Sequence, residues 1–125
     1  MTVSSAPQTL DSRAAVREAV AAILDTKGED VRVSDLKTVA DFTDWFVFAS
    51  GFNERQVQAI ADRVEERLKE HGTRPLHVEG FAPGQWVLLD YGDFIVHVFL
   101  DERRRFYGLE RLWGDAPDRT AEFVP

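Results

Sequence analysis

The chain has 125 residues, of which 44% are hydrophobic, and this size and composition fit one globular domain with its own core. It contains no cysteine, which excludes disulfides, thiolate metal sites and cysteine nucleophiles. Its formal net charge of −7 makes it a poor candidate for wrapping nucleic acid, because neutralising phosphates needs a basic surface. A basic protein partner fits this charge better than nucleic acid does, but the charge alone favours the simpler interpretation that it keeps the protein soluble.

The N-terminal segment, MTVSSAPQTL, consists largely of Ser, Thr, Pro and Gln, and we expect a flexible tail over residues 1–10. It has no Lys or Arg side chain and no long apolar stretch, so we expect neither a secretory signal nor a transit peptide. No apolar run in the chain approaches the roughly 20 residues that cross a membrane. We therefore expect a cytoplasmic protein with no membrane contact.

Two amphipathic helices are predicted from apolar residues that recur on one helical face. The first begins near Asp11 or Ser12, either of which is suited to cap it, and Gly28 is suited to end it. The second begins at Asn53, with Gln56 three residues later in a box-like arrangement, and closes at His71-Gly72. The apolar positions are Val16, Val20, Ile23 and Leu24 in the first helix, and Val57, Ile60, Ala61, Val64 and Leu68 in the second.

Strands are predicted where short apolar or alternating runs lie between turn residues. Residues 45–49 are apolar at every position, which is typical of a central strand covered on both faces. The hairpin turn Tyr91-Gly92-Asp93 joins the last two strands. The predicted strands span residues 31–34, 45–49, 75–79, 85–90 and 94–100.

Short helical turns are expected after the last strand, at residues 101–105 and 109–113. The order of elements predicts a single α/β domain over residues 11–116, with a mixed β-sheet of about five strands flanked by helices. We expect a flexible C-terminal tail over residues 117–125.

Several ordered motifs resemble the ribosomal silencing factor family, also called Iojap-like, from about residue 12 to residue 116. The longest is WVLLDYGDFIVHVF, over residues 86–99. The others are residues 44–47, Ser50-Gly51, residues 55–57, 60–62 and 78–80, Tyr107, Leu109-Glu110 and Leu112-Trp113. One departure is Trp45, where the family usually has Tyr or another residue; it affects only the local contact.

The resemblance implies a nucleotidyltransferase-like fold that has lost its catalytic carboxylates. It also implies binding to the large ribosomal subunit through ribosomal protein L-fourteen, on the face where the subunits meet. Such binding blocks subunit joining and represses translation under nutrient limitation. Family members tend to form homodimers when free, and the family role needs neither catalysis nor a cofactor.

Trp86 is the first candidate for partner binding, because an aromatic at the start of a strand after a Gly/Pro loop can be half exposed and anchor an interface. Strand alternation places Leu88 on the same face as Trp86. Glu79, Asp90 and Asp93 lie near loops around the same hairpin and are suited to pair with a basic partner. The alternatives are a core tryptophan and ordinary solvated turn residues.

Tyr107, Glu110 and Trp113 follow the hairpin on short helical turns and complete the set of candidate partner-binding residues. Tyr107 could equally be a core residue, and Trp113 either a core residue or a dimer contact. The basic run Arg103-Arg104-Arg105 is interpreted as a solvated helix face rather than a contact to ribosomal RNA.

The enzyme alternative lacks a suitable set of residues. Asp90 and Asp93 stand across a turn, not as the Asp-x-Asp pair that holds magnesium in nucleotidyl transfer. Ser50-Gly51 could open a phosphate-binding helix, but no carboxylate pair follows it. His97 lies mid-strand and fits a core position better than a catalytic one.

We therefore predict a non-enzymatic binding protein with no catalytic residue, bound metal or cofactor. Two alternatives stay open at this point: an enzyme on the nucleotidyltransferase-like fold, and a dimeric adaptor unrelated to the ribosome.

Overall fold

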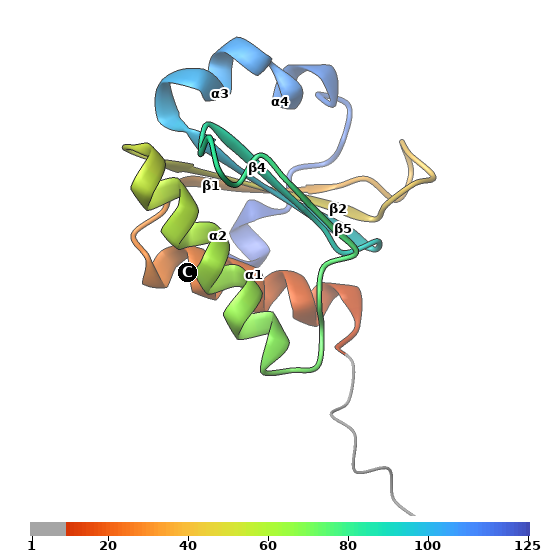
Figure 1. The fold of residues 1–125 in the computed structure, drawn as a ribbon. Coiled ribbons are helices and arrows are strands. Elements are labelled where there is room, and N and C mark those ends of the chain that lie inside the picture. Colours follow the sequence, from red (N-terminus) through yellow and green to blue (C-terminus); the bar gives the residue numbers. More distant parts are fainter. Residues whose placement is uncertain (1–9) are drawn as a thin grey trace, which may run out of the picture.

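Five β-strands form one mixed sheet in the order β1-β2-β5-β4-β3, in a computed structural model that describes residues 10–125 (Figure 1). The strands β2 and β5 pair in parallel, and the other neighbours pair antiparallel. This confirms the prediction of a single α/β domain with a mixed sheet. The strands are β1 (Glu29–Asp35), β2 (Trp45–Gly51), β3 (His77–Glu79), β4 (Trp86–Asp90) and β5 (Phe94–Leu100).

Helices cover both faces of the sheet, but unequally. The long helices α1 (Ser12–Asp25) and α2 (Glu54–Lys69) lie side by side against one face, and the short helices α3 (Asp101–Tyr107) and α4 (Leu109–Leu112) lie over the other (Figure 1). Every residue of β2 and β5 is buried, as expected for the two central strands of a sheet with covers on both sides.

At the start of α1 one of the two predicted caps is confirmed, whereas the end of the helix differs from the prediction. The Asp11 side chain accepts a hydrogen bond from the Ala14 backbone N–H at 2.7 Å, so Asp11 is the cap. At the other end Lys27, not Gly28, adopts the left-handed conformation, with φ of 63°. The Gly28 N–H bonds the Ile23 carbonyl at 2.8 Å, and a Cβ at Gly28 would lie 2.4 Å from the Ile23 side chain. Gly28 is therefore needed for a close approach rather than for its backbone freedom.

The start of α2 confirms the predicted cap and ties the two long helices together. Asn53 Oδ1 accepts from the Gln56 N–H at 2.8 Å, and Gln56 Oε1 accepts from the Phe52 N–H at 2.6 Å. The Gln56 amide nitrogen also donates to the Lys27 carbonyl at 3.1 Å. One side chain thus satisfies the beginning of α2 and a free carbonyl after the end of α1.

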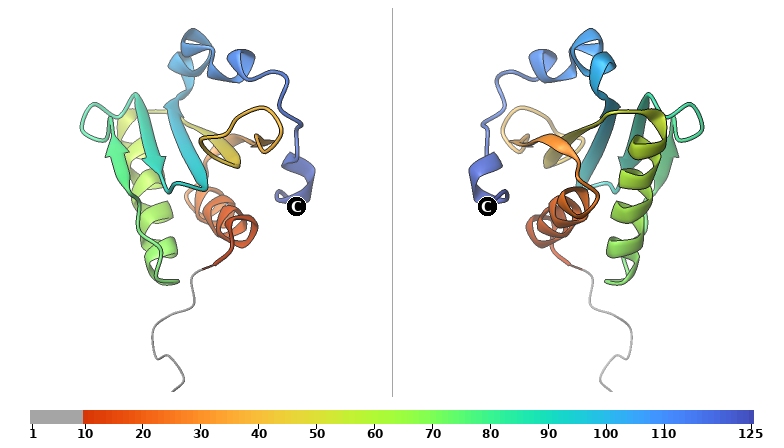
Figure 2. Two further views of the ribbon diagram at one scale, coloured as in Figure 1. Left: turned by 90° about the vertical axis from the view of Figure 1, so that its right-hand side faces the viewer. Right: turned by 90° about the vertical axis from the view of Figure 1, so that its left-hand side faces the viewer.

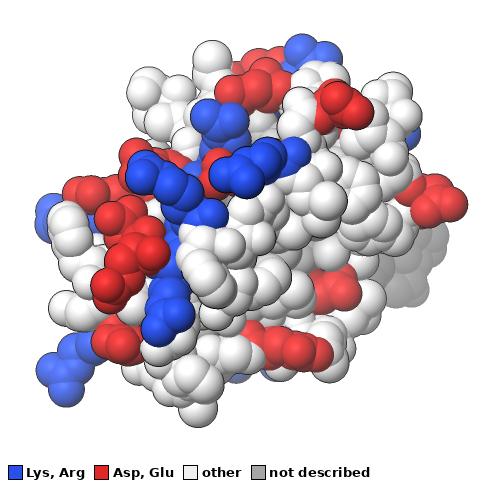
Figure 3. Space-filling model, turned by 90° about the horizontal axis from the view of Figure 1, so that it is seen from above, with Lys and Arg blue, Asp and Glu red and all other residues white. Residues whose placement is uncertain are grey.

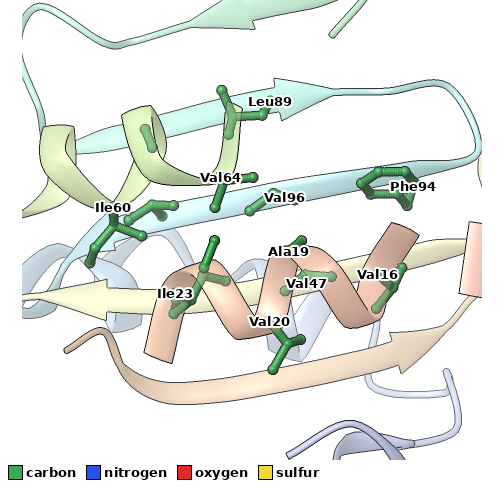
Figure 4. Packing of buried hydrophobic residues seen from close by; sticks show 14 of the residues in the cluster. Val16, Ala19, Val20, Ile23, Val47, Ile60, Val64, Leu89, Phe94 and Val96 are labelled. Atoms are coloured by element: carbon green, nitrogen blue, oxygen red, sulfur yellow. The ribbon is translucent and has the colours of Figure 1, made fainter. Parts of the chain in front are cut away.

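The main core lies between the sheet and the two long helices (Figure 4). Its side chains are mostly aliphatic, and the stripes predicted for both helices contribute to it, except that Leu24 is 38% exposed. Figure 4 labels Val16, Ala19, Val20, Ile23, Val47, Ile60, Val64, Leu89, Phe94 and Val96.

Residues 117–125 correct the expectation of a C-terminal tail. They run along the outer edge of β1, where the Asp35 N–H donates to the Pro117 carbonyl at 2.9 Å and the Arg119 N–H donates to the Val33 carbonyl at 2.8 Å. The short 3-10 helix η1 (Thr120–Glu122) follows, next to α1 (Figure 2). Phe123 is 6% exposed, with its ring centroid 5.4 Å from that of Trp45. Pairing with an open sheet edge and burial of an aromatic ring hold this segment in place. These contacts involve residues far apart in the chain, so a local sequence pattern does not predict them.

The predicted N-terminal tail lies outside the described residues except for Leu10, which is partly buried against the main core. Within residues 10–125, no helix has the length and apolar character needed to cross a membrane.

Replacing Phe123 with alanine should lower the free energy of unfolding by about 3 kcal/mol, because the ring leaves a cavity beside Trp45. The matched control is Phe106→Ala, since the Phe106 side chain is 76% exposed; it should change stability by less than about 0.5 kcal/mol. Urea unfolding of both variants measures this. Similar effects of the two substitutions would contradict the packing of the C-terminal segment.

Candidate functional site

The pairing register decides which predicted residues share a face of the sheet. Trp86 is paired with Phe99, Leu88 with His97, and Asp90 with Ile95, and paired residues project to the same side. This side faces away from α1 and α2, whose contacts are with the alternate residues such as Val87 and Leu89. The predicted alternation of Trp86 and Leu88 is therefore confirmed.

The sheet face away from α1 and α2 is rich in aromatic rings, and we call it the aromatic face. Its rings contact one another: His97 lies 4.7 Å from Phe46 in a T-shaped arrangement and stacks on Phe48 at 5.3 Å. The aromatic face consists of Phe46 and Phe48 of β2, Ile95, His97 and Phe99 of β5, and Trp86 and Leu88 of β4.

Trp86 is partly buried at the border of the aromatic face. Its ring stacks on Phe99 at 5.2 Å between centroids and lies 4.7 Å from the ring of Tyr107, which belongs to α3. Its indole Nε1 donates a hydrogen bond to His97 Nδ1 at 3.1 Å. Trp86 is thus a partly buried side chain that contacts Phe99, Tyr107 and His97.

His97 occupies the core position that the sequence predicted, with 2% of its surface exposed. Burial lowers the pKa of His97 to about 3, so the imidazole is neutral at physiological pH. Because Nδ1 accepts the hydrogen bond from Trp86, the proton lies on Nε2. That Nε2 atom has no hydrogen-bond partner within residues 10–125.

The helices α3 and α4 cover only part of the aromatic face. Leu109 and Trp113 pack against it from α4 and the residue that follows, and the Trp113 ring lies 5.9 Å from Phe46 and 5.6 Å from Phe42. Large apolar side chains stay exposed around this cover: Phe42 at 53%, Phe106 at 76%, Tyr107 at 39% and Leu112 at 74%. Viewed from this side, the molecule shows a broad uncharged area next to a band of Lys and Arg (Figure 3). Phe42, Phe106 and Leu112 were not among the predicted partner-binding residues, although Leu112 belongs to a motif of the family resemblance; their apolar character after a turn or on a short helix was the available signal.

The fold places the predicted acidic residues in two separate regions of the molecule. Glu79 lies on the edge strand β3, paired with Leu88, and its carboxylate contacts His77. Asp90 Oδ1 accepts from the Gly92 N–H at 2.8 Å in the hairpin turn, and Asp93 is exposed at the end of that turn. These three residues therefore lie along the β3–β4 edge and the adjoining turn.

Glu110 lies in a different region, where it contacts arginines of α3 and β1. It accepts hydrogen bonds from Arg104 Nε at 2.7 Å and Nη2 at 3.0 Å, and it lies 3.4 Å from Arg32 of β1. Arg104 of α3 and Arg32 of β1 both contact this carboxylate, so it ties α4 to α3 and to the sheet.

The basic run on α3 has two exposed members and one internal one. Arg103 and Arg105 are exposed, as interpreted from the sequence, whereas Arg104 is partly buried. Besides Glu110, Arg104 donates to the Ser50 hydroxyl at 2.8 Å, and Ser50 is 1% exposed. The Ser50 hydroxyl therefore accepts a hydrogen bond that joins β2 to α3.

Within the described part of the chain, no group of three or more His, Asp or Glu side chains is arranged to hold a metal ion. The side chains on the aromatic face present aromatic rings, aliphatic carbon and an indole N–H that already donates to His97. Such a set is suited to bind another protein surface.

Comparison with known proteins shows which family this chain resembles. A family model described as "Ribosomal silencing factor during starvation" matches residues 9–125. The chain is 37% identical over 114 residues to the ribosomal silencing factor RsfS of Bacillus subtilis, covering 91% of this chain and 97% of that protein. It is 42% identical over 106 residues to RsfS of Halalkalibacterium halodurans, covering 85% and 91%. A crystal structure of a Chromobacterium violaceum protein matches with a TM-score of 0.82 at 36% identity, covering 84% of this chain and 88% of that one. The nucleotidyltransferase-like part of the fold prediction stays a prediction.

Burial of a neutral His97 predicts a pH dependence of stability. The pKa of about 3 in the folded state lies below the ordinary 6.5, so the unfolded chain binds the proton first as the pH falls. Stability therefore falls as the pH drops from about 6.5 toward 3, by about 2 kcal/mol between pH 7 and pH 5.

The His97→Leu variant should lack this component, and denaturant unfolding of both proteins at pH 7 and pH 5 measures it. Carboxylates such as Glu18, whose pKa is lowered by a hydrogen bond from Arg67, add a loss of the same sign at lower pH. An equal loss in wild type and variant would show that His97 does not titrate in this way.

Proposed function

Because this chain belongs to the ribosomal silencing factor family, we propose that it binds the large ribosomal subunit in the cytoplasm through ribosomal protein L-fourteen. The bound protein stands where the small subunit must dock, so subunit joining is blocked and translation falls under nutrient limitation. This action needs occupancy of a surface and no chemical step.

The observation that carries the proposal is the aromatic face with its incomplete cover. Interface hot spots are enriched in tryptophan and tyrosine, surrounded by contacts that exclude water. Trp86 and Tyr107 lie with ring centroids 4.7 Å apart, and exposed Phe106 lies next to Tyr107 in the chain. A partner that covered these rings would bury apolar surface that α3 and α4 leave open.

The acidic residues beside this face support a basic partner. Glu79 pairs with Leu88 on the edge strand β3, Asp90 ends β4, and Asp93 lies in the turn between β4 and β5. Opposite charges at the rim of an interface steer the encounter and fix orientation more than they add affinity. We therefore assign these carboxylates to steering, Trp86, Leu88 and Tyr107 to anchoring, and Trp113 to support of the apolar surface. Glu110 contacts Arg104 and Arg32, which fix its position on α4, and it stays a predicted contact of the partner.

We also propose that the free protein forms a homodimer, as the resemblance implies. Sedimentation velocity at micromolar concentration tests this, and a monomer would contradict it.

Trp86→Ala should weaken binding to the large subunit by about 2 kcal/mol or more, which is about 30-fold, since the main anchor is lost. The control is Leu24→Ala, because Leu24 is a 38% exposed apolar residue on α1, away from the aromatic face. Co-sedimentation with separated large and small subunits, followed by a subunit-joining assay, measures binding and blocking.

Retention of the wild type on the large subunit alone, with joining reduced, is the expected result. Circular dichroism of the Trp86→Ala variant shows whether its fold survives. If binding and fold are lost together, Trp86 is a core residue and the site assignment is wrong. If neither subunit retains the wild type, the ribosomal proposal is wrong.

Neutralising two rim carboxylates, Asp93→Asn with Glu79→Gln, should slow association with the large subunit about three- to tenfold at low ionic strength and less at high salt. The control pair Asp62→Asn with Glu70→Gln changes the net charge equally, but on exposed positions of α2 and its cap. Stopped-flow association rates measure the difference. Equal slowing by both pairs would mean that net charge alone, and not this edge, steers binding.

A further inference from the structure

The side chains of Trp86 and His97 form a hydrogen bond that the proposed function does not by itself require. They are diagonal neighbours on the aromatic face, because Trp86 pairs with Phe99 and His97 pairs with Leu88 on adjacent strands. Tryptophan has a single hydrogen-bond donor, the indole N–H, and no acceptor. In Trp86 this donor is directed to His97 Nδ1 at 3.1 Å.

His97 is a fixed acceptor rather than an adaptable one. Its ring is 2% exposed, lies 4.7 Å from the Phe46 ring and stacks on Phe48 at 5.3 Å. Because it stands in the middle of β5, whose residues are all buried, its Nδ1 atom has one direction in which to accept. The other ring nitrogen, Nε2, has no partner within residues 10–125, so the bond to Trp86 is the only polar contact of the imidazole there.

We propose that His97 is a positioning residue, which holds the indole of Trp86 with its N–H toward the sheet and its open ring carbons toward the partner. This inference rests on the proposed function, in which Trp86 is the anchor. It adds a statement about the partner: the surface that meets Trp86 is aliphatic or cationic, because the ring has no free donor for a carbonyl or carboxylate acceptor. Lysine and arginine fit this description, since their stems are apolar and their charges favour the face of an indole ring.

Fixing the ring before binding contributes to affinity, because ordering a side chain on association costs free energy. Without the acceptor, Trp86 keeps its contacts with Phe99 and Tyr107 but can turn its N–H to water. We therefore expect His97→Leu to weaken binding to the large subunit about three- to tenfold. His97→Asn is the conservative variant, since its amide oxygen can accept near the position of Nδ1, and it should retain most of the affinity.

The first test observes the indole itself. The chain has three tryptophans, so a nitrogen-15-labelled sample gives three indole N–H signals, and Trp86→Phe identifies the one from Trp86. In His97→Leu this signal should shift and exchange faster with water, whereas His97→Asn should restore slow exchange. An unchanged Trp86 signal in His97→Leu would overturn the inference, whatever the ribosome-binding result.

The second test is a double-mutant cycle in large-subunit binding with Trp86→Ala and His97→Leu. If His97 acts through Trp86, His97→Leu should weaken binding of the otherwise unchanged protein and have no further effect once Trp86 is alanine. An equal loss in both backgrounds would show a general structural role and overturn the inference. Urea unfolding of each variant, with His97→Asn as the second replacement, separates loss of fold from loss of orientation.

Failure of the proposed function can be distinguished from failure of the positioning role of His97. If the unchanged protein does not bind the large subunit, the statement about the partner surface is overturned together with that function. The Trp86 indole signal of the first test does not depend on ribosome binding, and it still decides whether His97 holds the ring.

Discussion

The two central strands, β2 and β5, are buried along their whole lengths, and the rest of the structure has to provide a cover for each of their faces. A parallel pair in the middle of a sheet can be stable in water only when both of its faces are packed. On one face the cover is a pair of long helices whose aliphatic stripes meet aliphatic strand residues. On the other face it is a layer of rings that pack on one another, with two short helices over part of them.

These two covers differ in what they leave open. The stripes of α1 and α2 are almost fully used by the main core, so the outer faces of these helices carry mainly charged side chains. The seven-residue α3 and the four-residue α4 are too short to hide a five-stranded sheet, and exposed aromatic and aliphatic side chains surround them. The surface available for a partner is therefore a consequence of an incomplete second layer, and its position beside Trp86 follows from the strand order.

Ion pairs and edge contacts fix this incomplete layer in place. Arg104 reaches from α3 to Glu110 of α4 and to Ser50 of β2, which joins both short helices to a central strand. The last residues of the chain occupy the open edge of β1 and bury Phe123 against Trp45. Trp45 thus contacts the C-terminal segment and donates to the Ser12 hydroxyl at 3.2 Å, on the opposite side of the sheet from the aromatic face.

The local elements and their inner faces could be predicted from the order of residues along the chain. Apolar periodicity located both long helices, the cap at Asn53 was recognisable from residue type and spacing, and the run at residues 45–49 predicted a strand buried on both sides. Alternation along β4 placed Trp86 and Leu88 together for the same reason, since side chains of a strand project to opposite faces with a period of two. These features depend on residues that are near one another in the chain.

Contacts between side chains that are distant in the chain could not be predicted in this way, because they depend on how the elements pack. The contact of Glu110 with Arg32 of β1 and the pairing of residues 117–119 with the open edge of β1 were not predicted from the sequence. The bond between Trp86 and His97 depends on the register of β4 with β5, and the exposure of Phe42 and Leu112 depends on how far α3 and α4 extend over the sheet. Local patterns determine which face of an element is apolar, but the partners of that face are set by packing between elements far apart in the chain.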